Sequence, residues 1–298
     1  MSQDATLMDS LSQCRTITDS VSRLHCYDGI NKTDSQANDS SLSTDKKQFT
    51  RKMPVLLADL EEPRVFTAFG SLDFLGDNLD AILLGLGTRL KFKTFEQTNS
   101  KRPIDFNVIG LIKSQFDVSE LQTRNNRGGA LINTDFMVGG ELVKAYDQGY
   151  LRLKYTHRST HLGDEFLIDH PSFLQNRVNL SYETLDLLAY RDLNHWGAYL
   201  GSSLVVRSEP GSLEKTFQVQ AGSQYRGRKS GWYTPLFGID VKSWEASDWQ
   251  ANVSVKAGIE ISGYLDRPLQ LMFEYYDGKS PYGQFLKEDL EFIGLSVN

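Results

Sequence analysis

The sequence lacks any hydrophobic run long enough to cross a membrane as a helix. A spanning helix needs about 18 or more apolar residues. The longest apolar windows of this 298-residue chain, such as Ala81–Leu86, are broken within a few residues by glycine, threonine or charge. Hydrophobic residues make up 40% of the chain, which is low for a helical membrane protein. These features exclude membrane insertion as a helical bundle.

Proline is scarce, and the sequence has no excess of basic charge. Only 8 residues are proline, and the net charge is −6 with no basic stripe, which argues against nucleic-acid binding. Glycine, tyrosine and phenylalanine are plentiful, at 24, 13 and 16 residues. This composition is typical of amphipathic membrane strands, whose mean hydropathy stays modest because only every second side chain is apolar.

Cysteine is limited to Cys14 and Cys26. A close, even pair in a chain of envelope type suggests a disulfide. In one straight helix the two residues would lie about 18 Å apart, too far to bridge. A disulfide therefore requires a turn between them, near Thr18–Asp19. Two unlinked thiols in a cytosolic protein are the alternative.

From Val65 onward, apolar side chains recur at every second position. In Asn252–Ser262 one face is apolar and the other is polar or glycine, with Val253, Val255, Ala257, Ile259 and Ile261 opposite Asn252, Ser254, Lys256, Gly258, Glu260 and Ser262. The run has the length of one tilted membrane strand. Leu269–Tyr276 and Lys215–Arg226 repeat this pattern.

This periodicity predicts an all-β fold, a transmembrane antiparallel barrel of about twelve strands. The expected strands cover residues 64–75, 78–95, 102–118, 131–146, 149–162, 175–192, 195–208, 214–227, 232–246, 248–263, 267–277 and 288–298. The expected periplasmic turns, such as Asp147–Gly149, are short, and the longest connections, His161–Gln175 and Asp277–Lys287, fall on the opposite side. A soluble β-sandwich is the alternative, but a sandwich does not predict this parity.

The chain is expected to have three parts. Residues 1–30 form a short, helical, cysteine-bearing periplasmic segment. Residues 31–53 form a polar linker that cannot bury a core, and residues 54–298 form the outer-membrane barrel. The start Met1–Ala5 has neither a charged nor an apolar leader region. Because a barrel must be exported, we expect that a signal peptide was removed and Met1 added.

The most informative stretch is Tyr150–Asp164. Its alternation points apolar residues to lipid and basic residues to the lumen, with Leu151, Leu153 and Tyr155 against Arg152, Lys154 and Arg158. The same phase places His157, Ser159 and His161 on the lipid side. Polar and ionisable groups facing lipid are costly and mark functional sites. Polar residues that merely mark the membrane interface are the alternative.

The following strand is expected to bring Asn176 beside His157. Asn176 shares the predicted apolar face of Val178, Leu180 and Tyr182, at the strand end nearest the connecting loop. Ser159 lies two residues from His157, about 6.6 Å along the strand on the same face. In this hypothesis Ser159 attacks an acyl carbonyl, His157 takes its proton, and Asn176 fixes the imidazole tautomer.

This arrangement resembles outer-membrane phospholipase A, a twelve-stranded barrel with His-x-Ser and a following Asn-Arg on adjacent strands. The matching residues here are His157, Ser159, Asn176 and Arg177. The resemblance implies phospholipid hydrolysis, dependence on calcium and activation by formation of a homodimer. The loop between Ser159 and Asn176 is longer than in those lipases.

A closer likeness, over roughly residues 54–298, is to an uncharacterised family of bacterial outer-membrane proteins. It is carried by His161–Phe166, Leu180–Glu183 and Glu274–Phe285. This likeness implies the barrel fold and an outer-membrane location rather than a chemistry.

Several other polar residues are candidates for binding or for filling the lumen. Asp164 and Glu165 offer oxygen ligands for Ca²⁺, although a solvated acidic loop is the simpler interpretation. A transition-metal site at His157, His161, Asp164 and His170 matches no defined motif. The Asp277–Phe285 loop is expected to fold over the barrel mouth. Luminal Arg152, Lys154, Arg158 and Arg177 are expected to pair with Glu183, Glu260 and Glu274.

The sequence thus predicts an outer-membrane barrel with a lipid-facing Ser-His-Asn site that hydrolyses acyl esters of membrane lipids. Membrane lipids are the expected partners and calcium the expected cofactor. A non-catalytic outer-membrane protein that binds lipopolysaccharide or a partner is the first alternative, and a narrow channel is the second.

Overall fold

The computed structural model describes residues 14–19, 22–23, 26, 52–97, 100–119, 129–171, 180–262 and 268–298. The chain divides into two units, Met1–Arg51 and Lys52–Asn298. In the first unit, Cys14 and Cys26 form a disulfide with their Cα atoms 5.6 Å apart. The Asp19 carboxylate accepts a hydrogen bond from the Ser22 backbone N–H at 2.8 Å. The chain therefore turns between the two cysteines.

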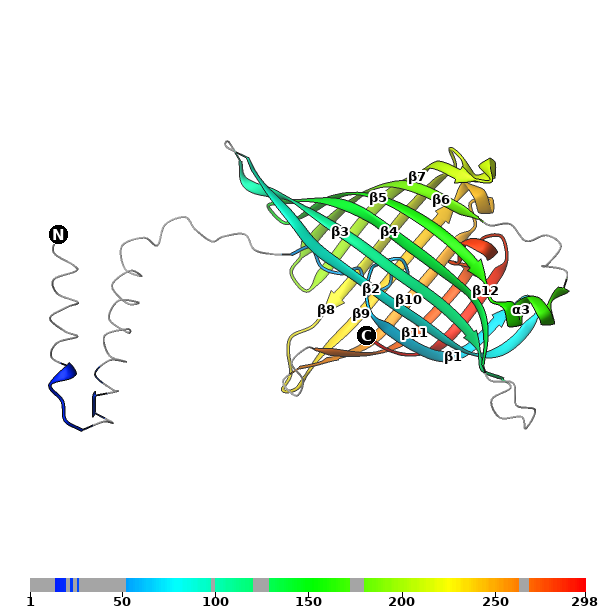
Figure 1. Ribbon diagram of the computed structural model, residues 1–298. Coiled ribbons are helices and arrows are strands. Elements are labelled where there is room, and N and C mark those ends of the chain that lie inside the picture. The colour runs from blue at the N-terminus through cyan, green and yellow to red at the C-terminus, as the bar shows by residue number, and fades with distance from the viewer. Residues whose placement is uncertain are drawn as a thin grey trace. The chain divides into compact units, whose positions relative to one another are not determined.

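The second unit is a closed barrel of twelve antiparallel strands (Figure 1). Each strand pairs with the next along the chain, and β12 pairs with β1 to close the barrel. The predicted fold is confirmed. The strands are β1 (Phe66–Phe74), β2 (Asp77–Gln97), β3 (Ser100–Asp117), β4 (Ala130–Tyr146), β5 (Gly149–Leu162), β6 (Ser181–Leu193), β7 (Trp196–Glu209), β8 (Phe217–Arg226), β9 (Tyr233–Trp244), β10 (Ala251–Ile261), β11 (Leu269–Lys279) and β12 (Asp289–Val297).

The barrel wall is apolar outside and polar inside, the reverse of a soluble β-barrel. In β10, Ser254, Lys256 and Glu260 are buried, and the alternate valines and isoleucines lie on the outer face. Exposed leucines continue this outer belt on neighbouring strands, including Leu151, Leu153, Leu185, Leu187, Leu200 and Leu204. Such alternation is the mark of strands that face lipid on one side and a polar lumen on the other. None of the helices in the described residues has both the length and the apolar character needed to cross a membrane.

The two ends of the barrel differ in their connections. At the turn end, β1 begins, β12 ends, and β4–β5 and β6–β7 are joined by two-residue turns. At the loop end, the connections after β5, β7, β9 and β11 carry the short helices α3 (Asp164–Asp169), η2 (Gly211–Leu213), η3 (Glu245–Ser247) and η4 (Gly283–Phe285). The β1–β2 connection is an exception at this end: it is a tight turn, with Leu75 and Gly76 at positive φ.

Residues 52–65, which we call the luminal segment, lie inside the barrel (Figure 1). Met53 and Leu56 are buried with Tyr150 and Tyr190 of the wall near the turn end. Leu60 packs against the apolar cluster of the loop end. The segment thus runs from the turn end into the lumen, reaches the loop end at Leu60, and comes back to the turn end, where β1 begins. The sequence prediction had assigned residues 54–65 to the barrel without this inward course.

The segment is held mainly by its carboxylates, which face basic residues of the wall. Asp59 contacts Lys242 at 2.6 Å, Glu61 contacts Arg158 at 2.5 Å, and Glu62 pairs with Arg152. Burial by itself raises the pKa of Glu62, but the positive charges of Arg152 and Arg89 outweigh burial and lower this pKa to about 2. Glu62 is therefore ionised at neutral pH.

The predicted luminal ion pairs are corrected by these contacts. Arg152 and Arg158 pair with the luminal segment, and Lys154 pairs with Asp186 at 3.3 Å. Glu260 pairs with Arg226, and Glu274 with Lys256 at 2.5 Å. Glu183 lies on the outer face, and Arg177 is outside the described residues. The prediction failed because the luminal segment supplies carboxylates that strand alternation does not reveal.

The loop between β11 and β12 folds into the mouth of the barrel at the loop end, as the sequence predicted. The Gly283 N–H donates to Asp135 Oδ2 at 3.0 Å, and the Gln284 N–H donates to Thr160 Oγ1 at 3.2 Å. Phe285 packs edge-on against Phe74, with ring centroids 4.9 Å apart. The lumen is therefore filled by polypeptide from both ends.

Candidate active site on the outer face

The alternation of β5 places His157 and Ser159 on the outer, lipid-facing side of the barrel. Along this strand Arg152, Lys154, Thr156 and Arg158 are buried, whereas the His157 side chain is 46% exposed. Ser159 and His161 continue the outward phase. The strand sits in a wall whose neighbouring positions, Phe136 and Val138 on β4, are exposed apolar residues.

The phase predicted for the next strand was wrong. Leu180 and Tyr182 are buried in a cluster on the luminal side, and Leu185 and Leu187 are the exposed apolar residues of β6. Both faces of this strand carry large apolar residues, so two-residue periodicity does not fix its orientation. Glu183 therefore lies on the outer face. Asn176 and Arg177 lie outside the described residues, and their predicted roles remain untested.

The residue opposite His157 on β6 is Glu183. His157 Nδ1 lies 3.4 Å from Glu183 Oε1. The same carboxylate oxygen lies 3.9 Å from a guanidinium nitrogen of Arg207 on β7, and the Tyr155 hydroxyl is close to Glu183. Tyr155, His157, Ser159, Glu183 and Arg207 form what we call the outer-face cluster.

The orientation of the imidazole is informative. Nδ1 faces Glu183, which leaves Nε2 for a second partner. Ser159 is two residues away on the same face, about 6.6 Å along the strand, and its Cα partners are Phe136 on β4 and Ser181 on β6. Within the described residues, its hydroxyl has no hydrogen-bond partner. The arrangement offers a hydroxyl, an imidazole and a carboxylate on one exposed face.

The remaining candidate residues are not part of this cluster. His161 stacks edge-on against Phe136, with ring centroids 5.8 Å apart. His170 stacks on Phe166 at the end of α3. Asp164 and Glu165 are exposed in the first turn of that helix. In the described parts of the chain, no three His, Cys, Asp or Glu residues are grouped so that they could hold a metal ion. Among the described residues, Asp164 and Glu165 thus have no third acidic residue beside them with which to hold Ca²⁺.

Sequence reasoning missed Glu183 and Arg207 as outer-face residues. Glu183 stands in one of the phrases shared with the resembling family, Leu180–Glu183, but its place opposite His157 depends on strand register. Arg207 follows an irregularity in the β6–β7 pairing that alternation does not predict. The clearest sign of Glu183 in the sequence was its charge, because it is a charged residue near the end of β6 that lies closest to His157 and Ser159.

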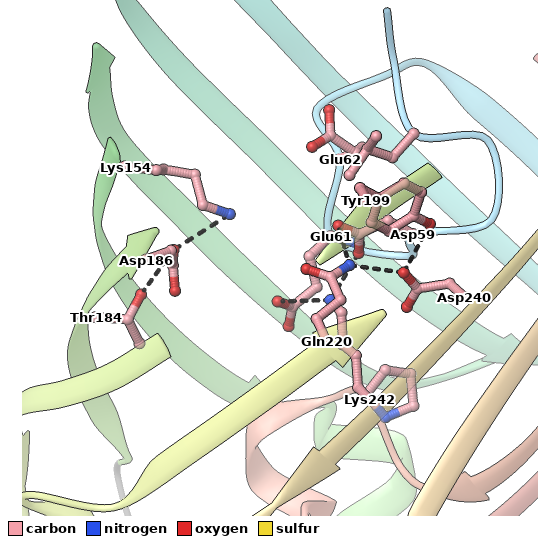
Figure 2. A network of polar contacts seen from close by, with 12 residues as sticks. Asp59, Glu61, Glu62, Lys154, Thr184, Asp186, Tyr199, Gln220, Asp240 and Lys242 are labelled. Carbon is pink, nitrogen blue, oxygen red and sulfur yellow. Dashed lines mark hydrogen bonds and ion pairs between the residues drawn. The ribbon is translucent and has the colours of Figure 1, made fainter. Parts of the chain in front are cut away.

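A second polar region lies in the lumen around Asp59 (Figure 2). The amide of Gln220 donates to Asp59 at 3.1 Å and to Asp240 at 2.7 Å, and Tyr199 donates to Asp240 at 2.8 Å. Towards the loop end, a cavity of about 900 Å³, including the part open to solvent, lies between Leu60 of the luminal segment and Tyr282 of the inward loop. Its basic residues are already paired with carboxylates.

Comparison with known proteins gives one family and several similar structures. The family described as "Protein of unknown function (DUF1207)" matches residues 48–298. Outer-membrane phospholipase A from Escherichia coli is similar in structure, with a TM-score of 0.52 and 10% identity over 84% of this chain and 95% of that chain. No curated protein matches this chain.

Two further structures are similar at lower scores. The calcium-bound outer-membrane phospholipase dimer of Salmonella typhi has a TM-score of 0.49 and 10% identity over 80% of this chain and 91% of that chain. The KdgM porin has a TM-score of 0.41 and 9% identity over 78% of this chain and 99% of that chain. At 10% identity, the likeness to the Escherichia coli phospholipase concerns the fold alone, that of an outer-membrane barrel.

Proposed function

This chain belongs to the DUF1207 family of proteins of unknown function, and we propose that it hydrolyses acyl esters of membrane lipids at the outer-face cluster. One observation carries the proposal. An imidazole on the lipid-facing side of the barrel lies 3.4 Å from a carboxylate and shares its face with a serine hydroxyl. Polar and ionisable groups on a lipid-facing surface are costly and are therefore candidates for a functional site.

The proposed reaction gives each of the three groups a role. Ser159 Oγ attacks the ester carbonyl while His157 Nε2 takes the hydroxyl proton, and Glu183 stabilises the imidazolium through Nδ1. The C–O bond of the ester then breaks, and His157 returns the proton to the departing alcohol of the lysolipid. Water, activated by the same imidazole, releases the fatty acid from Ser159.

The closed lumen supports a substrate that arrives from the membrane. The luminal segment and the inward loop occupy the two ends of the barrel. The outer-face cluster, by contrast, is reached directly from the lipid phase. A narrow channel, one of the two alternatives, is disfavoured by the same filling.

The test is hydrolysis by the full chain reconstituted in vesicles of phosphatidylglycerol and phosphatidylethanolamine, measured as fatty acid released. Ser159→Ala removes the nucleophile, so we expect release to fall to the level of empty vesicles. Ser181→Ala removes the neighbouring hydroxyl on β6 and serves as the matched control, with release at the native rate.

Native-level release by the Ser159→Ala variant would contradict the nucleophile. No release by the native chain, with or without added calcium, would contradict the proposed function. That result would favour the other alternative, a non-catalytic outer-membrane protein that binds lipopolysaccharide or a partner.

The resemblance to the lipases also implies that calcium is required and that the chain acts as a homodimer. Asp164 and Glu165 do not fit a cation site with other described residues, so we route no step of the reaction through calcium. Asn176 remains an alternative partner for His157. Chelation with EDTA and measurement of the oligomeric state in detergent address the first two points.

A further inference from the structure

β7 carries an arginine on its outer face that strict alternation would turn into the lumen. Trp196, Leu200 and Leu204, all at even-numbered positions, are exposed along the outer face of β7. Beyond them, Val205 is buried and the Arg207 side chain is 70% exposed.

The change of phase has a defined cause. The β6–β7 register runs from Glu183 opposite Arg207 directly to Thr184 opposite Val205, so Val206 is an extra residue. An extra residue of this kind is a β-bulge, and bulges commonly redirect a side chain beside a functional site. Here the bulge turns Arg207 outward, next to Glu183.

Three polar residues therefore form one row across adjacent strands. His157 lies opposite Glu183, and Glu183 lies opposite Arg207. On the turn-end side of this row the outer face is apolar, beginning with Leu185 and Leu153. On β5, β6 and β7 the row therefore marks the change from apolar to polar outer residues, and the head groups of a bilayer border such an apolar band.

We propose that Arg207 binds the phosphate of a glycerophospholipid whose ester lies at Ser159. This inference rests on the proposed hydrolysis and names its substrate class. The contact between Arg207 and Glu183 is long, at 3.9 Å, and the exposed guanidinium keeps donors for a second partner. A guanidinium matches the geometry of phosphate oxygens and binds them through two parallel hydrogen bonds.

The spacing suits one lipid molecule. Arg207 is level with His157 across two strand spacings, about 10 Å, and Ser159 lies about 6.6 Å further along β5, so the backbones of Arg207 and Ser159 are about 12 Å apart. The long side chain of Arg207 shortens this separation by extending to Glu183 on the strand between them. In a glycerophospholipid, the phosphate and the ester are separated only by the glycerol carbons. A phosphate on Arg207 would therefore place an ester carbonyl near Ser159, and Glu183 between the two strands would orient both the imidazole of His157 and the guanidinium of Arg207.

The first experiment measures binding without hydrolysis. The full chain in detergent micelles is titrated with dialkyl ether phosphatidylglycerol, which has no ester, and with the corresponding dialkyl glycerol, which has no phosphate. We expect the native chain to bind the phosphate lipid more tightly than the dialkyl glycerol. In Arg207→Gln the ratio of the two affinities should fall at least about tenfold, which is the effect of losing one charge-assisted hydrogen bond.

Arg191→Gln is the matched control. Arg191 lies on the outer face of β6 at the turn end, where it contacts Gln148. This variant should keep the native preference. An unchanged preference in Arg207→Gln, or an equal loss in Arg191→Gln, would overturn the proposal.

The second experiment separates recognition from catalysis. With ester substrates, Arg207→Gln should lower kcat/KM for phosphatidylglycerol at least about tenfold and leave hydrolysis of diacylglycerol at the native rate. Equal losses on both substrates would overturn the role in recognition. If the native chain hydrolyses neither substrate while binding still depends on Arg207, the proposed hydrolysis fails and the phosphate site stands.

Discussion

Glu183 is the residue that joins the outer-face cluster. The sequence hypothesis placed an amide, Asn176, beside His157, because an amide orients an imidazole without adding a buried charge. The structure has a carboxylate at the position opposite His157, and this carboxylate also lies near Arg207. A nearby guanidinium compensates the negative charge, so a carboxylate can take the place that the hypothesis gave to an amide.

The first residue-scale prediction concerns this choice of partner. Glu183→Gln keeps the size of the side chain but removes the charge that stabilises the imidazolium. We expect hydrolysis in vesicles to fall about 10²–10⁴-fold. Glu291→Gln, which removes an outer-face carboxylate on β12, should hydrolyse like the native chain. A loss confined to Asn176→Ala, with Glu183→Gln unaffected, would restore the amide as the partner.

The sequence predicts individual positions well only where alternation is strict. β5 alternates throughout, so the outward placement of His157 and Ser159 was accessible from sequence. β6 carries apolar residues on both faces, and its phase was assigned wrongly at Tyr182. On β7 the extra residue Val206 reverses the phase. A bulge depends on how two strands pair, and the residue pattern of one strand does not show this pairing.

The luminal segment is the element with the largest effect on the barrel interior. Residues 52–65 contain no helix or strand. The Arg64 guanidinium donates to the backbone carbonyls of Leu57 at 2.7 Å and Asp59 at 2.9 Å, which stabilises the bend in the segment. Its position therefore depends on side-chain contacts with the wall more than on regular structure.

We predict that Glu62→Gln releases this segment. The change leaves Arg152 and Arg89 without the carboxylate that they share, and breaking a buried ion pair in this way costs about 3–5 kcal/mol. Trypsin cleavage after Arg64, followed by mass spectrometry, should become much faster. Glu260→Gln, which alters a pair on the barrel wall, should leave this cleavage slow. Equal protection of Arg64 in both variants would show that the ion pairs do not hold the segment.

The strands were predictable as elements, but the luminal segment was not. Predicted and observed strand ends mostly differ by a few residues, and the largest difference is at the start of β6, expected at 175 and found at Ser181. Before β1, the run Asp59–Arg64 has high charge and a proline but no periodicity. Only one feature of the sequence indicated the luminal segment. The luminal faces of the strands carry more basic than acidic residues, so another part of the chain must supply acidic partners.

At the scale of the whole molecule, the barrel is closed by charge complementarity. The wall contributes Arg152, Arg158 and Lys242, and the luminal segment supplies the carboxylates that neutralise them. If the segment left the lumen, these cations would line the opening. The open barrel would therefore attract anions.

This arrangement predicts the electrical behaviour of the protein. The native full chain should show no steady conductance in planar bilayers. The triple variant Asp59→Asn, Glu61→Gln and Glu62→Gln should conduct, with a reversal potential in a KCl gradient that indicates chloride preference. Cation preference in the triple variant would contradict the charge argument.

A crosslink supplies the control for that experiment. A Cβ atom at Gly238 would lie 3.4 Å from the Cβ atom of Ala58, close to the separation found in disulfides. Ala58→Cys with Gly238→Cys, added to the triple variant, should abolish conductance when oxidised and restore it when reduced. Conductance that ignores the oxidation state would show that ions do not follow the path of the segment.

The course of the luminal segment also determines how it would respond to force. It enters and leaves the lumen at the same end, with Met53 near the entrance and Leu60 deepest. Tension applied at Lys52 would load the contacts of Met53, Leu57 and Asp59 in sequence rather than together. Contacts loaded one after another peel apart at low force. A small force applied at Lys52 would therefore draw the segment out of the lumen one contact at a time.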